Sequence, residues 1–130
     1  MLERRRRALA GALLAAALLV VALVVAAPGG AAGGHKLSLR ASASGALKYN
    51  KKTLTTTRGK ATITLTNPSG SGLKHGLEVE GHGIEKRAKN IGPGKTSSVT
   101  VRLKAGTYQF YCPVDGHKAA GMKGKIVVKR

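Results

Sequence analysis

The C-terminal third of the sequence holds a closely spaced set of side chains that could bind a soft metal ion. Cys112, His117 and Met122 follow one another at five-residue intervals. Pro113 blocks the continuation of a strand that ends at Cys112. Two glycines let the chain fold back so that the three side chains converge: Gly116 and Gly121. A convergent loop of this kind is typical of a metal site.

A fourth donor, His75, opens a segment in which apolar and polar residues alternate. In a strand, His75, Leu77 and Val79 share one face, while Glu78 and Glu80 share the other. His75 is therefore expected to point into the core. Thiolate and thioether are soft ligands and imidazole is borderline, and two His and one Cys in a plane with a weak axial Met form an electron-transfer copper centre. We predict one copper ion, cycling between Cu(I) and Cu(II), at four ligands: His75, Cys112, His117 and Met122.

The elements that must position these donors are short strands bounded by turns. Alternation predicts strands near residues 37–40, 62–66, 99–104 and 126–128, and a Thr-rich strand or sheet edge at 53–57. No run has helical apolar spacing in this part of the sequence. Regularly spaced strands of this kind favour an all-β fold, an antiparallel sandwich or barrel.

The N-terminal residues have the layout of an export signal. Arg4 to Arg7 precede an apolar run over residues 8–27. The run is longer than the roughly 7 to 15 residues of a cleaved signal, and as a helix it would reach about 30 Å, enough to span a bilayer. Residues 1–27 are thus a signal peptide or a membrane anchor, and either places the rest of the chain outside the cytoplasm. Residues 28–34 are expected to form a Gly/Ala linker before one domain at 35–130.

The chain is strongly basic, with a formal net charge of +18. Residues 1–27 contain four arginines and one glutamate, so +15 remains on the rest. Such a surface attracts acidic proteins or anionic lipid headgroups, and can also simply keep the domain soluble. Nucleic acid is not an expected partner, because no aromatic platform is interleaved with the lysines and arginines. We expect a monomer with redox partner proteins that are acidic, and residues 8–27 could also serve as a membrane tether.

From about Leu37 to the C-terminus, the sequence resembles the small blue-copper proteins, or cupredoxins, of the plastocyanin and azurin type. The resemblance rests on several short motifs: Asn67 after a strand, His75, Gly106-Thr107-Tyr108, the 112–122 loop and Gly121-Met122-Lys123-Gly124. It implies a Greek-key fold and a type 1 copper site in which the thiolate is Cys112, the axial thioether is Met122 and the two imidazoles belong to His75 and His117. It also implies a single-electron carrier, not an enzyme, with His117 as the exposed ligand.

Two departures from that family concern the surroundings of the copper. The Cys-x4-His-x4-Met loop is longer before the His than in plastocyanin and longer after it than in azurin, and it is similar to the loops of rusticyanin and auracyanin. Gly76 stands where plastocyanin and azurin carry an Asn that helps brace the site. Both departures leave the reduction potential open.

Other readings of the same residues remain. Zinc can bind two His and one Cys, although Met122 argues against it, and the single Cys excludes a binuclear copper centre. A copper oxidase or nitrite reductase domain would need further copper sites, and the sequence contains no His-x-His pair. A copper-handling or copper-sensing protein is the alternative to a carrier. The remaining candidates are expected to be non-ligands, in turns or in packing: His35, His82, Phe110, Tyr111 and Asp115.

Overall fold

The protein is described by a computed structural model that covers residues 34–130. The predicted apolar helix, the signal or anchor at 1–27 and all of the predicted linker except Gly34 lie outside the described residues. Within residues 34–130, no helix is long and apolar enough to cross a bilayer.

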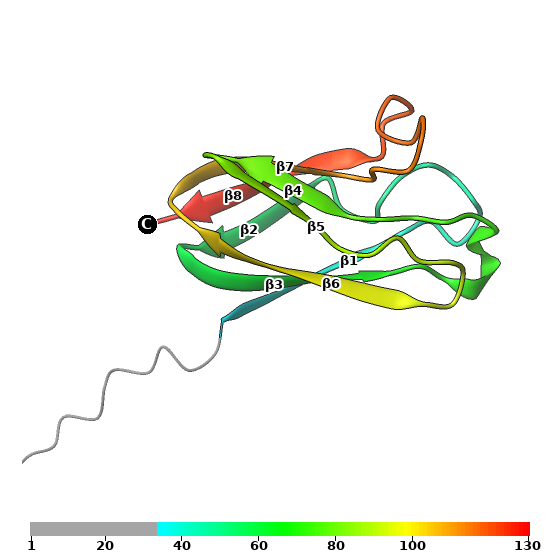
Figure 1. Ribbon diagram of the computed structural model, residues 1–130, viewed down its shortest axis with the longest axis horizontal. Helices are drawn as coiled ribbons and strands as arrows, with labels where there is room; N and C mark the ends of the chain where they lie inside the picture. Colours follow the sequence, from blue (N-terminus) through cyan, green and yellow to red (C-terminus); the bar gives the residue numbers. More distant parts are fainter. Residues whose placement is uncertain (1–33) are drawn as a thin grey trace, which may run out of the picture.

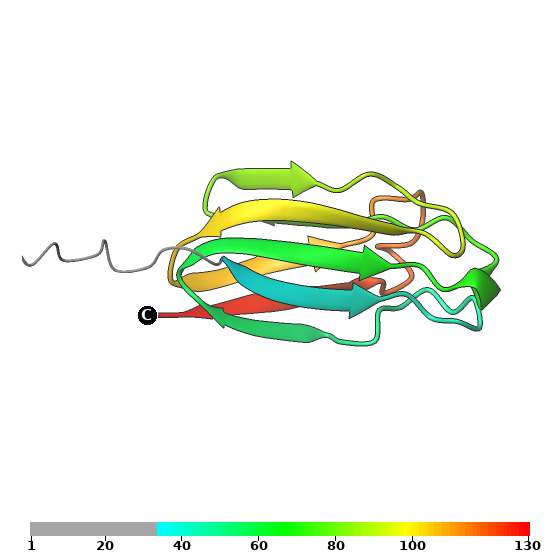
Figure 2. The ribbon, with the colours of Figure 1, turned by 90° about the horizontal axis from the view of Figure 1, so that it is seen from below.

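Eight strands form two sheets that pack face to face (Figures 1 and 2). One sheet has the order β1-β3-β6 and the other the order β2-β8-β7-β4-β5. The strands are β1 (His35–Arg40), β2 (Thr53–Thr57), β3 (Gly59–Thr66), β4 (Glu78–Gly81), β5 (Ile84–Arg87), β6 (Thr96–Leu103), β7 (Gly106–Tyr111) and β8 (Lys123–Lys129), with a short 3-10 turn η1 (Ser69–Ser71) after β3. The predicted all-β sandwich is confirmed.

The core lies between the sheets and is built by the alternation seen in the sequence. In β6, Val99, Val101 and Leu103 are buried, while the residues between them are exposed. The opposite sheet contributes Phe110 and Ile126, both fully buried. Because successive side chains of a strand point to opposite faces, each strand gives one row to the core and one to solvent.

Strand pairing is mixed, whereas the sequence suggested antiparallel pairs. β1 pairs with β3, and β2 with β8, in parallel register, while the remaining pairs are antiparallel. The reason is the path of the chain: after β1 it crosses to the other sheet as β2, then returns as β3. The chain reverses its direction twice, once before β2 and once before β3, so β3 runs parallel to β1. The Thr-rich strand β2 forms a sheet edge, as predicted.

The two ends of the sandwich carry different segments. The loop between β7 and β8 projects at one end, while the start of β1 and the C-terminus lie at the other (Figures 1 and 2). The predicted metal-binding loop is therefore as far from the beginning of the domain as the sandwich allows.

Candidate metal centre

The loop after β7 is closed by backbone hydrogen bonds that bring its donors together. The N–H of Cys112 donates to the carbonyl of Met122 at 3.0 Å, and the N–H of Met122 donates to the carbonyl of His117 at 3.0 Å. Gly116 and Gly121 have φ values of 78° and 105°, which favour glycine. The predicted fold-back of this loop is thus confirmed.

His75 reaches the same place from the loop between η1 and β4. Its N–H donates to the carbonyl of Ile91 at 3.0 Å, and the N–H of Ile91 donates back at 2.8 Å. His75, Leu77 and Val79 are all fully buried, as their alternation predicted. β4 itself begins only at Glu78, so His75 is held by an isolated bridge and not by a continuous strand.

Asn67, buried directly after β3, fixes this bridge. Its side-chain amide donates to the carbonyls of Leu73 at 2.8 Å and Ile91 at 3.0 Å, and its side-chain oxygen accepts from the Ser71 hydroxyl at 2.6 Å. The Asn67 side chain therefore holds the segment before His75 close to Ile91, the residue that forms the bridge with His75. Loss of these bonds would remove one of the hydrogen bonds made by each of three groups, the carbonyls of Leu73 and Ile91 and the hydroxyl of Ser71.

The donor atoms form one compact, buried group. The thiol sulfur of Cys112 and nitrogens of His75 and His117 lie within 4.8 Å of one another, and Cys112 Sγ is 3.4 Å from His117 Nδ1. Both ring nitrogens of His75 are buried with no hydrogen-bond partner among the described residues. A buried polar atom without a partner is costly, and a metal ion would supply the partner.

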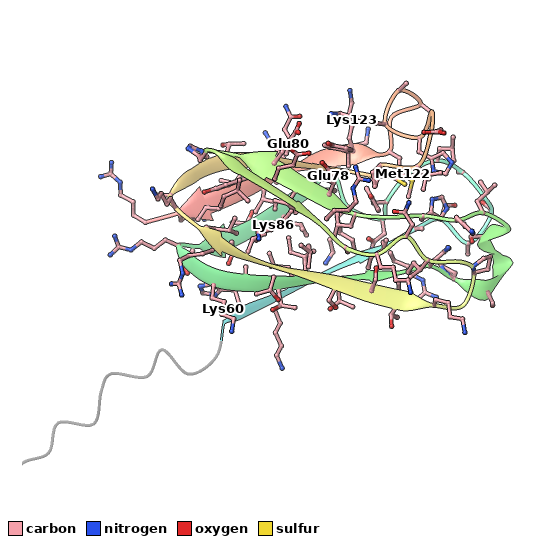
Figure 3. All side chains as sticks on the ribbon, in the orientation of Figure 1. Lys60, Glu78, Glu80, Lys86, Met122 and Lys123 are labelled. Carbon is pink, nitrogen blue, oxygen red and sulfur yellow. The ribbon has the colours of Figure 1, made fainter. Side chains whose placement is uncertain are left out.

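Met122 completes the set chemically. It is fully buried and lies at the base of the loop, at the end of the sandwich opposite Lys60 (Figure 3). A thioether beside a thiolate and two imidazoles is a soft donor set, which copper prefers over zinc. The residues present therefore fit one copper ion.

The Cys112 sulfur accepts a hydrogen bond from Gly76, which is itself hydrogen-bonded to Tyr49. The N–H of Gly76 donates to Cys112 Sγ at 3.3 Å, and the hydroxyl of Tyr49 donates to the carbonyl of Gly76 at 2.6 Å. The Tyr49 ring packs edge-on against Phe110, with ring centroids 5.5 Å apart. Tyr49 thus holds Gly76 through its carbonyl, while the N–H of the same residue donates to the Cys112 sulfur.

Steric contacts explain why position 76 is a glycine. A Cβ at this position would collide with the side-chain amide of Asn90 and lie 3.0 Å from Pro113 Cδ. Asn90 therefore occupies the space beside Gly76, and no side chain fits at position 76 without moving it.

Burial sets the protonation preferences of the donor residues. It raises the pKa of the Cys112 thiol, against the opposing effect of the Gly76 N–H. It also lowers the pKa of His75, and the nearby His117 adds to that effect. Neutral imidazole is the form that binds a metal, whereas the thiol must lose its proton. Metal binding here should therefore release a proton from Cys112.

Only one of the four candidate donors reaches the surface. His117 is 7% exposed, whereas His75, Cys112 and Met122 are each 0% exposed. The other two histidines are elsewhere: His35 bonds to the Thr57 hydroxyl at 3.0 Å, and His82 is exposed in the β4–β5 turn. Neither joins the donor group.

Three residues around the centre were not singled out from the sequence: Tyr49, Asn90 and Ile91. Tyr49 comes from the irregular segment after β1, and its bond to Gly76 spans 27 residues of sequence. Asn90 and Ile91 follow β5 in a short segment without alternation. No local pattern marks any of them, because their role comes from long-range packing.

A buried thiol, two imidazoles and a thioether at one end of a β-sandwich define a cupredoxin-type copper-binding protein. The sequence profile of copper binding proteins of the plastocyanin/azurin family matches residues 36–129. The chain belongs to that family.

Two curated proteins are similar to this chain. The copper-resistant cuproprotein CopI of Rubrivivax gelatinosus is 27% identical over 110 residues, covering 71% of this chain and 66% of CopI. The chloroplastic plastocyanin of Chlamydomonas reinhardtii is 34% identical over 95 residues, covering 66% of this chain and 61% of plastocyanin. The matched part thus spans somewhat less than two thirds of each relative's length.

Solved structures share the fold. Auracyanin B matches with a TM-score of 0.66 at 21% identity, covering 74% of this chain and 89% of auracyanin. The copper nitrite reductase of Nitrosomonas europaea matches with a TM-score of 0.60 at 23% identity, covering 75% of this chain but 42% of the reductase. These likenesses confirm the predicted cupredoxin-like sandwich.

Proposed function

We propose that this protein is a single-electron carrier that holds one copper ion through His75, Cys112, His117 and Met122. Bound copper would supply the one-electron redox couple. The chain's own residues hold the donors in place, exclude water and leave one imidazole edge at the surface. A carrier needs these features, because an electron must leave through a ligand without the ligands rearranging.

The observation that carries the proposal is the pair of buried, unpartnered ring nitrogens of His75 beside the Cys112 thiol. Backbone hydrogen bonds on both sides hold these groups, so the fold itself fixes the positions of the donors. A donor set fixed by the fold suits a metal that changes oxidation state with little change in geometry.

A copper-handling role is the second candidate, and the similarity to a copper-resistant cuproprotein favours it. A handler must release copper, whereas a carrier must retain it in both oxidation states. The 0% exposure of three of the four donors supports retention. An enzymatic role is less well supported, because the chain spans 42% of the copper nitrite reductase that it resembles.

We place this function outside the cytoplasm. The support is in the sequence, where Arg4 to Arg7 precede the apolar residues 8–27.

The test is the spectrum and voltammetry of the copper-loaded protein. We expect an intense visible thiolate-to-copper band, a narrow copper hyperfine splitting and reversible one-electron cycling. Cys112→Ser should abolish the band, whereas Thr100→Ala, exposed on the outer face of β6, should leave it intact. A colourless Cu(II) complex would refute the assignment, and loss of copper on reduction would favour the copper-handling role.

A further inference from the structure

A cluster of basic side chains lies at the end of the sandwich opposite the candidate metal centre. Four exposed residues line one hollow there, from the β2–β3 turn, the end of β6, the β6–β7 turn and the C-terminus: Arg58, Arg102, Lys104 and Arg130. We call these four residues the basic pole. Each of the four carries a positive charge.

Within residues 34–130, every acidic residue lies on an element other than those that carry the basic pole. Glu78 and Glu80 lie on β4, Glu85 on β5 and Asp115 in the metal-binding loop. Strands β2, β3, β6 and β8, which begin or end at the basic pole, contain no acidic residue, whereas β4 and β5, joined by a turn at the same end, carry Glu78, Glu80 and Glu85. At the loop end, Lys118 is 3.5 Å from Glu80. Within residues 34–130, none of the four side chains of the basic pole forms an ion pair with a carboxylate.

The chain enters the domain beside the basic pole. A Cβ on Gly34 would come within 2.7 Å of the Lys60 carbonyl oxygen, so the Gly34 backbone lies directly against β3. His35 Nε2 lies 3.4 Å from the carbonyl of Arg58 and 3.0 Å from the Thr57 hydroxyl. Lys60 and Met122 mark the two opposite ends in Figure 3. The apolar residues 8–27 are thus joined to this end of the sandwich.

We propose that the basic pole docks on an anionic lipid surface. Residues 28–34 span at most about 25 Å when extended, so a domain attached to a bilayer through residues 8–27 keeps the basic pole close to the headgroups. The attraction acts within about 8 Å at physiological ionic strength. β3 alone is about 26 Å long, so the metal-binding loop lies beyond that range.

Lipid fits this end better than an acidic protein because of where the chain enters. A protein partner of an electron carrier must approach the exposed edge of His117, which is at the other end. Docking through the basic pole turns that edge away from the bilayer. The docking does not require copper, and only its consequence for electron transfer rests on the proposed function.

The experiment uses the full chain with lipid nanodiscs that contain a gadolinium-chelating lipid. In discs of equal parts phosphatidylglycerol and phosphatidylcholine, we expect amide NMR signals of Gly59 and Ala105 to broaden more than those of Gly116 and Gly121. In pure phosphatidylcholine discs the difference should become smaller, because only the attachment through residues 8–27 then keeps the basic pole near the headgroups. Arg58→Glu with Arg102→Glu should lower the population of the docked orientation by more than about 25-fold, since each basic residue contributes roughly fivefold.

A matched control reverses two charges at the opposite end, in Lys52→Glu with Lys125→Glu, and should leave the pattern unchanged. Arg102→Gln with Lys104→Gln repeats the test without introducing negative charge. Equal broadening in both kinds of disc, stronger broadening of the loop glycines, or equal effects of the two reversed pairs would overturn the proposal. The proposal would also be overturned if the broadening did not depend on lipid charge while an acidic ferredoxin shifted the amide signals of the basic pole. That result would make the basic pole a binding site for a protein.

Discussion

Met122 is the donor whose replacement separates ligand chemistry from folding. It is fully buried at the end of the loop, and its backbone bonds to Cys112 and His117 do not depend on its side chain. A glutamine at this position offers an oxygen donor, which favours the oxidised ion, whereas a leucine offers none.

We therefore expect Met122→Gln to retain copper with a lower reduction potential, and Met122→Leu to raise the potential. Voltammetry of the two variants measures both shifts. If neither variant changed the potential, Met122 would not be a ligand.

Tyr49 should tune the same potential without touching the metal. Its hydroxyl donates to the carbonyl of Gly76, and the N–H of the same residue donates to the Cys112 sulfur. A donor to the sulfur stabilises its negative charge and hence the reduced form, so Tyr49→Phe should lower the potential and cost about 1 kcal/mol of stability.

Tyr108→Phe is the matched control, because the Tyr108 hydroxyl accepts from the N–H of Lys104 at 2.9 Å at the opposite end. It should lose similar stability with no change in potential. Equal potential shifts in the two variants would contradict a specific role for Tyr49.

At the residue scale, the donors were predictable and their supports were not. Cys112, His117 and Met122 are adjacent in sequence, and alternation alone aimed His75 inward. Tyr49 and Asn90 meet Gly76 only through the packing of distant segments. Sequence patterns predict local geometry only. Contacts between segments that are distant in sequence therefore cannot be predicted from them.

Among the elements, the edge strand β5 pairs with β4 through its backbone and through one half-buried ion pair. Arg87 Nε donates to the Glu78 carboxylate at 2.7 Å. Burial alone would raise the pKa of Glu78, but the hydrogen bonds, first that of Arg87, outweigh it and hold the pKa below its ordinary value. A lowered folded-state pKa means that the ionised carboxylate stabilises the fold above the unfolded pKa, about 4.3.

The free energy of unfolding should therefore fall as the pH drops below about 4.3 and through the lower folded-state pKa. Glu78→Gln should cost about 1 to 2 kcal/mol at neutral pH, because Arg87 is 58% exposed and solvent screens the pair. Urea unfolding at neutral and acidic pH measures both effects.

The double variant with Arg87→Gln supplies the control. It should be less destabilised than the sum of the single variants, because neither partner is left alone. Simple additivity, or an unchanged acid dependence in Glu78→Gln, would show that the pair does not hold β5.

Element positions followed from alternation, but strand pairing did not. The buried rows of β3, β6 and β8 are the apolar residues that alternate in the sequence. β2 pairs with β8, which lies at the other end of the domain sequence. Whether two strands pair in parallel depends on where the chain passes from one sheet to the other. The periodicity of apolar residues does not predict where the chain does so.

For the whole molecule, the basic charge should steer an acidic redox partner to the exposed edge of His117. Four lysines line a hollow beside the metal-binding loop: Lys52, Lys118, Lys123 and Lys125. Steering raises association rates by about 10 to 1000-fold and weakens with salt. The second-order rate of electron transfer from an acidic ferredoxin should therefore fall steeply as salt rises.

Charge reversal of Lys118 and Lys123 should lower that rate more than reversal of Lys36 and Lys60 on the other sheet. Lys52 is unsuitable as a control because it lines the same hollow. A rate that is insensitive to salt, or equal losses for the two pairs, would show that the lysines serve only solubility.

The placement of Tyr49 also gives the protein an intrinsic optical reporter. The sequence has three tyrosines and no tryptophan, so its ultraviolet emission comes from Tyr49, Tyr108 and Tyr111. Tyr49 bonds to the residue after His75, and Tyr111 directly precedes Cys112, whereas Tyr108 bonds to Lys104 at the far end. An ion in the centre would quench the two nearby emitters more than the third, so fluorescence can follow copper uptake without an added dye.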